Sequence, residues 1–109
     1  MNDYMNRLIE LGYADEAGIV ASVDYTVSDG RTGKGFLCVN GEVVTLAAGD
    51  EWEKVFKDSI DRLDGMTVKS GLFKKRILFT YNGLDYTFTV KNGKNLIDYF
   101  KLLAADKEN

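Results

Sequence analysis

The chain contains no histidine and no proline, and it has a single cysteine among its 109 residues. The absence of histidine removes the commonest general base and the commonest metal ligand. One cysteine without histidine also excludes a conventional structural zinc site and an intramolecular disulfide. We therefore expect a protein that is not an enzyme and that needs no metal or other cofactor, in a reducing compartment, the cytoplasm.

Long apolar segments are missing as well. No window approaches the roughly eighteen consecutive apolar residues of a membrane-spanning helix, and the first ten residues lack the basic and apolar regions of a secretory signal. Hydrophobic residues make up 45% of the chain and aromatic residues 12%, which is typical of a globular protein. We expect a single domain over 1–109, with an N-terminal helix in 1–13, a core in 18–104 and a polar tail at 106–109.

Alternating apolar residues predict antiparallel strands. From Gly18 to Ser28 every second side chain is apolar, as in a half-buried strand. Asn40-Gly41 and Asn82-Gly83 lie between apolar runs, and we expect both to form two-residue hairpin turns. The turn at 82–83 sets a register in which large side chains share one face, with Tyr81 opposite Leu84, Phe79 opposite Tyr86, and Ile77 opposite Phe88.

A helix is expected near each end of the chain. The first covers residues 3–11, with Asn2 or Asp3 as its cap, Gly12 as its end, and an apolar stripe of Tyr4, Met5, Leu8 and Ile9. Such a short helix is marginal in water, so it must dock on this domain or on another chain. Asn95 caps the second helix, which reaches about Ala104 and packs its apolar stripe onto the sheet: Leu96, Ile97, Phe100, Leu103 and Ala104.

The middle of the chain is harder to assign. Asp50 and Glu53 resemble a helix-capping pair, and the apolar residues that follow keep helical spacing, which predicts a short helix near 51–57. The stretch Ile60 to Ser70 is expected to form one strand or two, interrupted near Asp64-Gly65.

Few side chains remain as candidates for chemistry. Asp58, Asp61 and Asp64 do not match the spacing of a calcium loop, and we interpret them as a solvated segment. Cys38 lies in an apolar strand, which suits a buried thiol better than a nucleophile. The glycine-rich loop at 28–35 lacks the first glycine and the final serine or threonine of a phosphate-binding loop, and it leads into a strand.

Nucleic acid is not an expected partner. The net charge is −3 and the pI is about 4.9, so the chain as a whole repels a polyanion. Lys34-Gly35-Phe36 opens like the RNA-binding strand of an RRM, but Leu37 and Cys38 replace the small and aromatic residues that should follow.

Basic residues form a candidate face for an anionic ligand or an anionic lipid surface. Four precede the second hairpin and two belong to the glycine-rich loop: Lys69, Lys74, Lys75, Arg76, Arg31 and Lys34. Alternation along a strand sends Lys75 to one side and its two neighbours to the other, which leaves diffuse, salt-sensitive attraction at most. The alternative is a solvated loop whose lysines guard a strand edge. We expect little or no binding to anionic vesicles.

The order of elements resembles a known family. Residues 84–90 and 92–100 resemble the end of pleckstrin-homology-like domains, particularly the bacterial, GRAM-like branch, and residues 35–44 resemble the early hairpin of that branch. The resemblance covers about residues 18–104. It implies an α+β fold in which antiparallel strands bend into a partly open barrel and the last helix plugs one end through Phe100 and Leu103. It also implies binding of lipids, peptides or sister subunits, and no catalysis.

Two functions therefore remain open. The first is a bacterial, cytoplasmic module for protein–protein interaction or self-assembly, with a partner that the sequence does not identify. The second is weak peripheral binding of an anionic lipid or a small anionic ligand through the basic loops. Size-exclusion chromatography with light scattering and liposome co-sedimentation separate the two.

Overall fold

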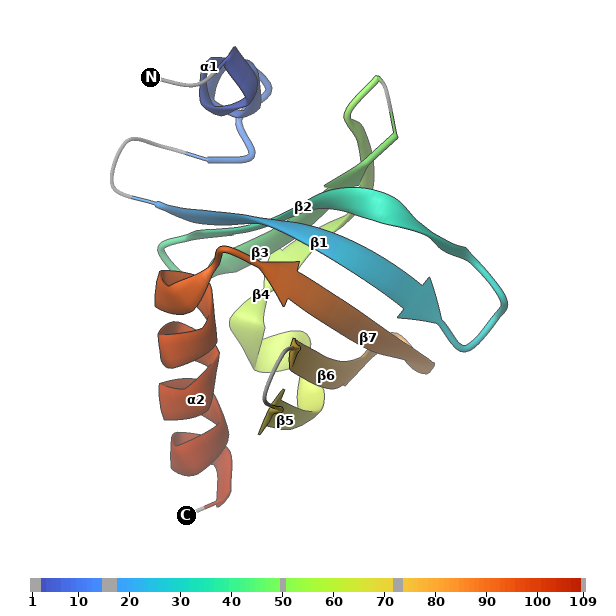
Figure 1. Ribbon diagram of the computed structural model, residues 1–109, viewed down its shortest axis with the longest axis vertical. Helices are drawn as coiled ribbons and strands as arrows, with labels where there is room; N and C mark the ends of the chain where they lie inside the picture. The colour runs from blue at the N-terminus through green and yellow to red at the C-terminus, as the bar shows by residue number, and fades with distance from the viewer. Residues whose placement is uncertain (1–2, 15–17, 50, 72–73, 109) are drawn as a thin grey trace.

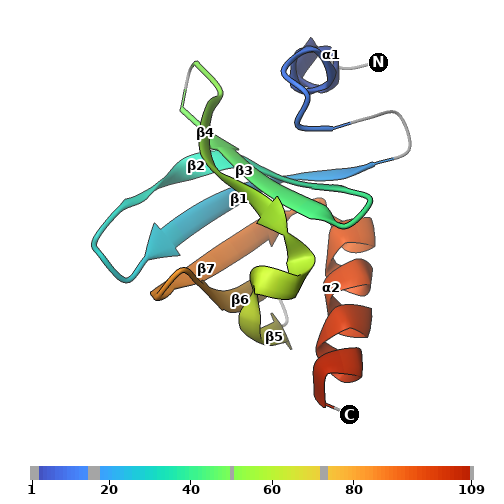
Figure 2. The same ribbon diagram turned by 180° about the vertical axis from the view of Figure 1, so that it is seen from behind.

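The computed structural model describes residues 3–14, 18–49, 51–71 and 74–108. Within them, seven antiparallel strands form one curled sheet, a half-barrel, and a helix lies near each end of the chain (Figure 1, Figure 2). This confirms the predicted α+β class and the C-terminal capping helix. The elements are α1 (Asp3–Glu10), β1 (Ile19–Val27), β2 (Thr32–Asn40), β3 (Val43–Ala48), β4 (Glu53–Ser59), the 3₁₀ helix η1 (Ile60–Arg62), β5 (Asp64–Ser70), β6 (Lys75–Tyr81), β7 (Leu84–Lys91) and α2 (Lys94–Glu108).

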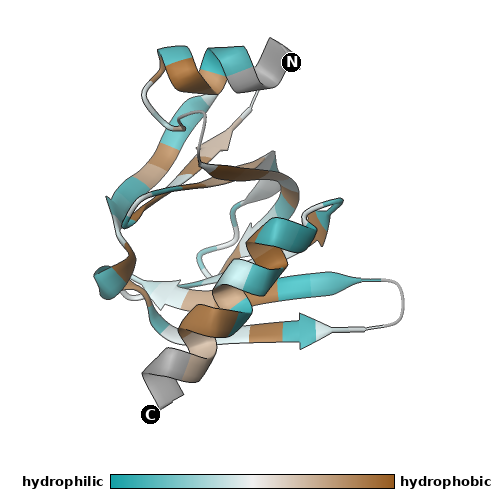
Figure 3. Cartoon of the chain, turned by 90° about the vertical axis from the view of Figure 1, so that its left-hand side faces the viewer, coloured by the Kyte–Doolittle hydropathy of each residue, from teal (hydrophilic) through white to brown (hydrophobic). Residues whose placement is uncertain are grey.

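The sheet has the strand order β4-β3-β2-β1-β7-β6-β5, so β1 joins the strands of the first half of the chain to those of the second. The alternation predicted for β1 is confirmed, because Ala21, Val23 and Val27 are buried while Ser22 and Thr26 are exposed. The buried residues face the concave side of the sheet. Figure 3 shows α2 lying across one opening of the curled sheet, and α2 packs mainly against β5.

The β6–β7 hairpin has the predicted register. Tyr81 pairs with Leu84, Phe79 with Tyr86, and Ile77 with Phe88. Asn82 and Gly83 both have positive φ, 54° and 80°, which a type I′ turn requires and which these two residue types tolerate. Phe79, Tyr86, Phe88 and Ile77 are all buried on the concave side.

The β2–β3 turn is displaced by one residue from the prediction. Asn40 pairs with Val43, so the two turn residues are Gly41 and Glu42 rather than Asn40 and Gly41. In the predicted register Glu42 would stand opposite Val39 and share its buried face, whereas the observed register places Val44 there. The cost of burying an unpaired carboxylate explains the difference.

The helix predicted near 51–57 is wrong, because residues 53–59 form strand β4. Phe56 stands opposite Leu46 of β3 and is buried in the main core. A β-bulge between Leu46 and Ala47 shifts the pairing. Periodicity misled the prediction because Phe56 and its neighbours are apolar at a spacing that a bulged strand also accommodates. Asp50, the predicted cap, lies outside the described residues.

The remaining boundaries differ in detail. The stretch from Ile60 to Ser70 is interrupted, but earlier than the predicted Asp64-Gly65. Ile60–Arg62 form the 3₁₀ helix η1 rather than a strand, and Asp64 and Gly65 already belong to β5, whose pairing with β6 shifts between Asp64 and Thr67. Asn95 does not cap α2, because the helix begins at Lys94 and the Ile97 amide donates to the Gly93 carbonyl at 3.0 Å. A Cβ atom at Gly93 would lie 2.5 Å from Val90 Cγ1, so glycine is required there.

The predicted apolar stripe of α2 is confirmed, and that of α1 is confirmed at Leu8, which is buried, among the side chains that the structure describes. In α2, Leu96, Ile97 and Phe100 are buried, and Leu103 and Ala104 pack against the core; the helix continues past Ala104 to Glu108. α1 begins at Asp3, so Asp3 is its first residue rather than its cap. The predicted cap Asn2 and the side chains of Tyr4 and Met5 lie outside the described residues. Neither described helix has the length and apolar character needed to cross a bilayer.

The buried hairpin gives the first prediction. Phe88→Ala should lower the free energy of unfolding by about 3–5 kcal/mol, because it removes a fully buried ring from the centre of the core. Thr89→Ala, on the opposite face of the same strand, is the matched control and should change stability little. Urea denaturation of both variants measures the difference, and similar losses for the two would contradict the assignment of faces.

Candidate functional site

The N-terminal helix α1 docks on the convex face of the sheet, opposite the main core (Figure 1). Leu8 is fully buried there and packs in a small cluster with Ala14, Cys38 and Ala47. The helix that the sequence required to dock therefore docks on its own chain. Among the side chains of α1 that the structure describes, those of residues 6–10, Leu8 is the one that is buried.

The end of α1 is tied to the edge strand β4. Gly12 has φ 78°, and its amide donates to the Ile9 carbonyl at 3.0 Å, which ends the helix as predicted. The Lys57 ammonium of β4 donates to the Gly12 carbonyl at 3.2 Å. A cation at the C-terminal end of a helix also interacts favourably with the helix dipole.

Four residues beside α1 form what we call the aromatic patch: Tyr13, Val20, Phe36 and Trp52. Each is half-buried, and each packs against the Leu8 cluster. The rings of Phe36 and Trp52 are stacked, with centroids 4.7 Å apart and planes inclined by 21°. Trp52 has a positive φ of 56°, a conformation that costs a bulky residue roughly 1–3 kcal/mol.

Sequence patterns did not reveal this patch. The sequence predicts a helix for the segment that contains Trp52 and a strand for the segment that contains Phe36, and neither prediction brings the two rings together. The two rings meet because the β2–β3–β4 meander brings together segments that the sequence separates. One signal for Phe36 is present in the sequence. Side chains alternate along β2, so Phe36 lies on the face opposite to the core residues Leu37 and Val39.

Cys38 and Thr45 lie beneath α1. Burial raises the pKa of the Cys38 thiol to about 12, which keeps the thiol protonated at neutral pH and agrees with the prediction of a buried, unreactive thiol. Thr45 stands opposite Cys38, and its hydroxyl oxygen is buried with no hydrogen-bond partner in the described structure. An unsatisfied buried hydroxyl costs about 1–3 kcal/mol, which the packing around Thr45 must offset.

The three aspartates Asp58, Asp61 and Asp64 do not converge on a common site. Asp58 accepts a hydrogen bond of 2.7 Å from the Tyr81 hydroxyl and lies 3.2 Å from Nε of Arg62. The Tyr81 hydrogen bond lowers the pKa of Asp58, and the same bond raises the pKa of Tyr81. Asp61 and Asp64 are exposed. The described residues contain no group of carboxylates and thiols arranged to hold a metal ion.

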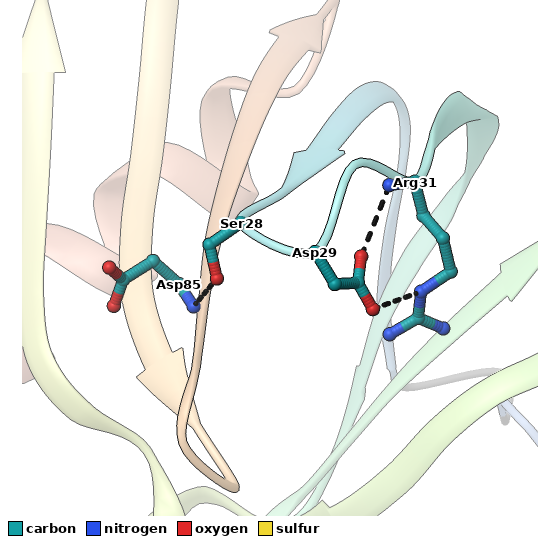
Figure 4. Close-up of polar contacts among 4 residues, drawn as sticks. All are labelled: Ser28, Asp29, Arg31 and Asp85. Carbon is teal, nitrogen blue, oxygen red and sulfur yellow. Dashed lines mark hydrogen bonds and ion pairs between the residues drawn. The ribbon is translucent and has the colours of Figure 1, made fainter.

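Arg31 of the candidate basic face is engaged within its own loop. Its backbone amide and its Nε both donate to the Asp29 carboxylate, at 3.1 Å and 2.9 Å (Figure 4). The side-chain hydrogen bond to Asp29 raises the pKa of Arg31. The loop is anchored to β7, because the Asp85 amide donates to the Ser28 hydroxyl at 3.0 Å. Arg31 is therefore a loop-stabilising residue with an internal counter-ion.

The other five basic residues are divided among three places. Lys34 is exposed on β2, opposite Asp24, and two strands separate it from β6. Three residues line one depression of about 280 Å³ at the end of the β5–β6 hairpin: Lys69, Lys74 and Arg76. Lys75 lines a different depression, of about 490 Å³, together with Lys94 and Gly93 at the start of α2. The separation of Lys75 from its neighbours agrees with the predicted alternation.

Comparisons with known proteins do not assign the chain to a family. No protein-family model matches the sequence, and no curated protein matches it. Two surfaces of the convex face remain as candidate binding sites, the aromatic patch and the depression lined by Lys69, Lys74 and Arg76.

The docking of α1 predicts the behaviour of Cys38. Leu8→Asp places a charge in the small cluster, so α1 should detach and the rate of Cys38 modification by a thiol reagent should rise well above that of the wild type. Asn6→Asp adds the same charge to the exposed side of α1 and should leave the rate low. Equal rates for the two variants would show that α1 does not protect the thiol.

The Asp58–Tyr81 hydrogen bond predicts a pH dependence. Because the pKa of Asp58 is lowered on folding, its contribution to stability is complete above the unfolded pKa of about 3.9 and is lost as the pH falls through the folded pKa. The pKa of Tyr81 is raised on folding, so its contribution to stability is complete below the unfolded pKa of about 10 and is lost as the pH rises through the folded pKa. The melting temperature of Tyr81→Phe should differ from that of the wild type most near neutral pH. A difference that stays constant from neutral to strongly acid pH would contradict this coupling.

Proposed function

We propose that the chain is a non-catalytic binding module that interacts with another protein surface, a second copy of the chain included, through the aromatic patch. The observation that carries this proposal is the stacked, half-buried Phe36–Trp52 pair on the convex face. Tryptophan, tyrosine and phenylalanine are enriched at protein interfaces, because a rigid ring contributes a large contact area at a small cost in side-chain entropy.

The backbone of Trp52 supports a role beyond packing. A tryptophan with positive φ is unusual, since glycine or asparagine adopts that conformation with little strain. Strained residues persist where the surrounding structure holds them, and they cluster at binding and catalytic sites. In this fold the surrounding structure holds Trp52 in that conformation with its ring stacked on Phe36, and both side chains are half-buried.

The sheet edges support binding through a face rather than through strand addition. The edge strand β4 carries Lys54 and Lys57, and its pairing with β3 contains a bulge. The other edge strand, β5, carries Lys69, and its pairing with β6 contains a shift between Asp64 and Thr67. Charges and bulges on edge strands are devices that oppose pairing with another chain.

The fold supports the same class of function. A curled seven-stranded sheet with a packed C-terminal helix is consistent with the resemblance to bacterial pleckstrin-homology-like domains, and we include that assignment in the proposal. The resemblance implies binding without chemistry, although a fold alone does not establish function. An unpaired cysteine held as a buried thiol further supports a reducing, cytoplasmic location.

Sedimentation velocity over a wide range of protein concentration tests the proposal. Trp52→Asn removes the ring and keeps a residue that tolerates positive φ, so the fold should survive. The wild type should associate as its concentration rises, and Trp52→Asn should remain monomeric. Leu102→Asn is the matched control, because Leu102 is 69% exposed on α2, away from the aromatic patch, and this variant should behave as the wild type.

A second measurement covers a partner other than the chain itself. Peptides selected from a random library on the wild-type protein should lose binding to Trp52→Asn and keep binding to Leu102→Asn. The proposal is contradicted if the wild type stays monomeric and no selected peptide depends on Trp52.

A further inference from the structure

Three basic side chains that the sequence separates come together on the convex face at the end of the β5–β6 hairpin. Lys69 of β5 stands directly opposite Arg76 of β6 in the strand pairing, and Lys74 precedes β6 by one residue. Together with Gly71 they line the depression of about 280 Å³. This surface lies on a different hairpin from the aromatic patch, so it is independent of the proposed protein-binding role.

The arrangement places like charges side by side. Lys69 and Arg76 are cross-strand neighbours, and like charges in that position repel and destabilise the sheet. Within 66–105 the only acidic residues are Asp85 and Asp98. Asp85 accepts a hydrogen bond of 2.7 Å from Thr80, and Asp98 pairs with Lys94 at 3.2 Å. In the described part of the chain, no ion pair neutralises Lys69, Lys74 or Arg76.

The strand pairing fixes the backbone positions of Lys69 and Arg76. β6 is paired on both sides, with β5 and with β7, and Arg76 stands opposite Thr89 of β7. The Gly71 amide donates to the Lys74 carbonyl at 2.8 Å, which closes the end of the hairpin. Arginine offers a planar fork of donors that matches two oxygens of a phosphate, and lysine adds a point charge.

We propose that Lys69, Lys74 and Arg76 form a binding site for a phosphate-type dianion, free or in a lipid headgroup. The depression is slightly smaller than the roughly 300–1,000 Å³ of typical drug-sized ligand sites, and its lining is mainly apolar, so the contact to the anion comes from the charged ends of the three side chains. The anion relieves the repulsion between Lys69 and Arg76 that the protein itself leaves uncompensated. Lys75 takes no part, because it lines the depression beside α2.

The test measures binding of the whole chain to two probes at low salt, inorganic pyrophosphate by calorimetry and phosphatidic-acid vesicles by co-sedimentation. The dissociation constant should rise by about tenfold or more in Arg76→Ala and in Lys69→Ala, as loss of a charge-assisted hydrogen bond implies. Lys75→Ala removes the same charge one residue from Arg76 and should change the constant by less than about twofold, since Lys75 lines the other depression. Circular dichroism spectra confirm that each variant is folded.

Each outcome decides the proposal. Binding of pyrophosphate alone, dependent on Arg76 and not on Lys75, supports a site for a soluble phosphate compound. The same dependence with vesicles supports a site for a headgroup. If the wild type binds neither probe, the site does not exist. If Lys75→Ala weakens binding as much as Arg76→Ala, the overall charge of the hairpin attracts the anion and there is no specific site.

Discussion

The register of the β6–β7 hairpin is the constraint on which the rest of the structure depends. It places Phe79, Tyr86 and Phe88 on the concave face, where they contact rings from distant parts of the chain. The ring centroid of Phe56 in the edge strand β4 lies 5.2 Å from that of Tyr86. The ring centroid of Phe100 in α2 lies 6.3 Å from that of Phe79. These contacts hold the curled sheet to its edge strand and to its capping helix.

This concentration of rings inside the sheet determines what the convex face can do. With the large core residues turned inward, the outer face carries mainly polar side chains between its two distinctive surfaces. At one end α1 covers the Leu8 cluster and leaves Phe36 and Trp52 half-buried. At the other end the β5–β6 hairpin presents Lys69, Lys74 and Arg76. Both proposed binding surfaces therefore belong to the face that the core does not use.

Local sequence predicted most of the elements whose signals are local, although the equally local Asn40-Gly41 signal placed its turn one residue too early. The Asn82-Gly83 turn, the alternation of β1 and the stripe of α2 each depend on neighbouring residues, and each is confirmed. β4 escaped prediction because its strand identity comes from pairing with β3 through a bulge.

The candidate sites depend still more on contacts between distant segments. Lys69 could not be placed beside Arg76, nor Phe36 beside Trp52, until the register of separate strands was known. The sequence did supply the six basic residues and the separation of Lys75 from Arg76. It could not show that Arg31 is engaged with Asp29.

The most direct test of this account is a nuclear Overhauser spectrum of the β6–β7 hairpin. The account predicts cross-strand contacts between Leu78 and Thr87 and between Arg76 and Thr89, since these residues stand directly opposite one another. A register displaced by one residue would instead bring Leu78 opposite Tyr86 or Phe88. That result would turn the core rings and Arg76 to other faces, and it would contradict both the core and the basic site.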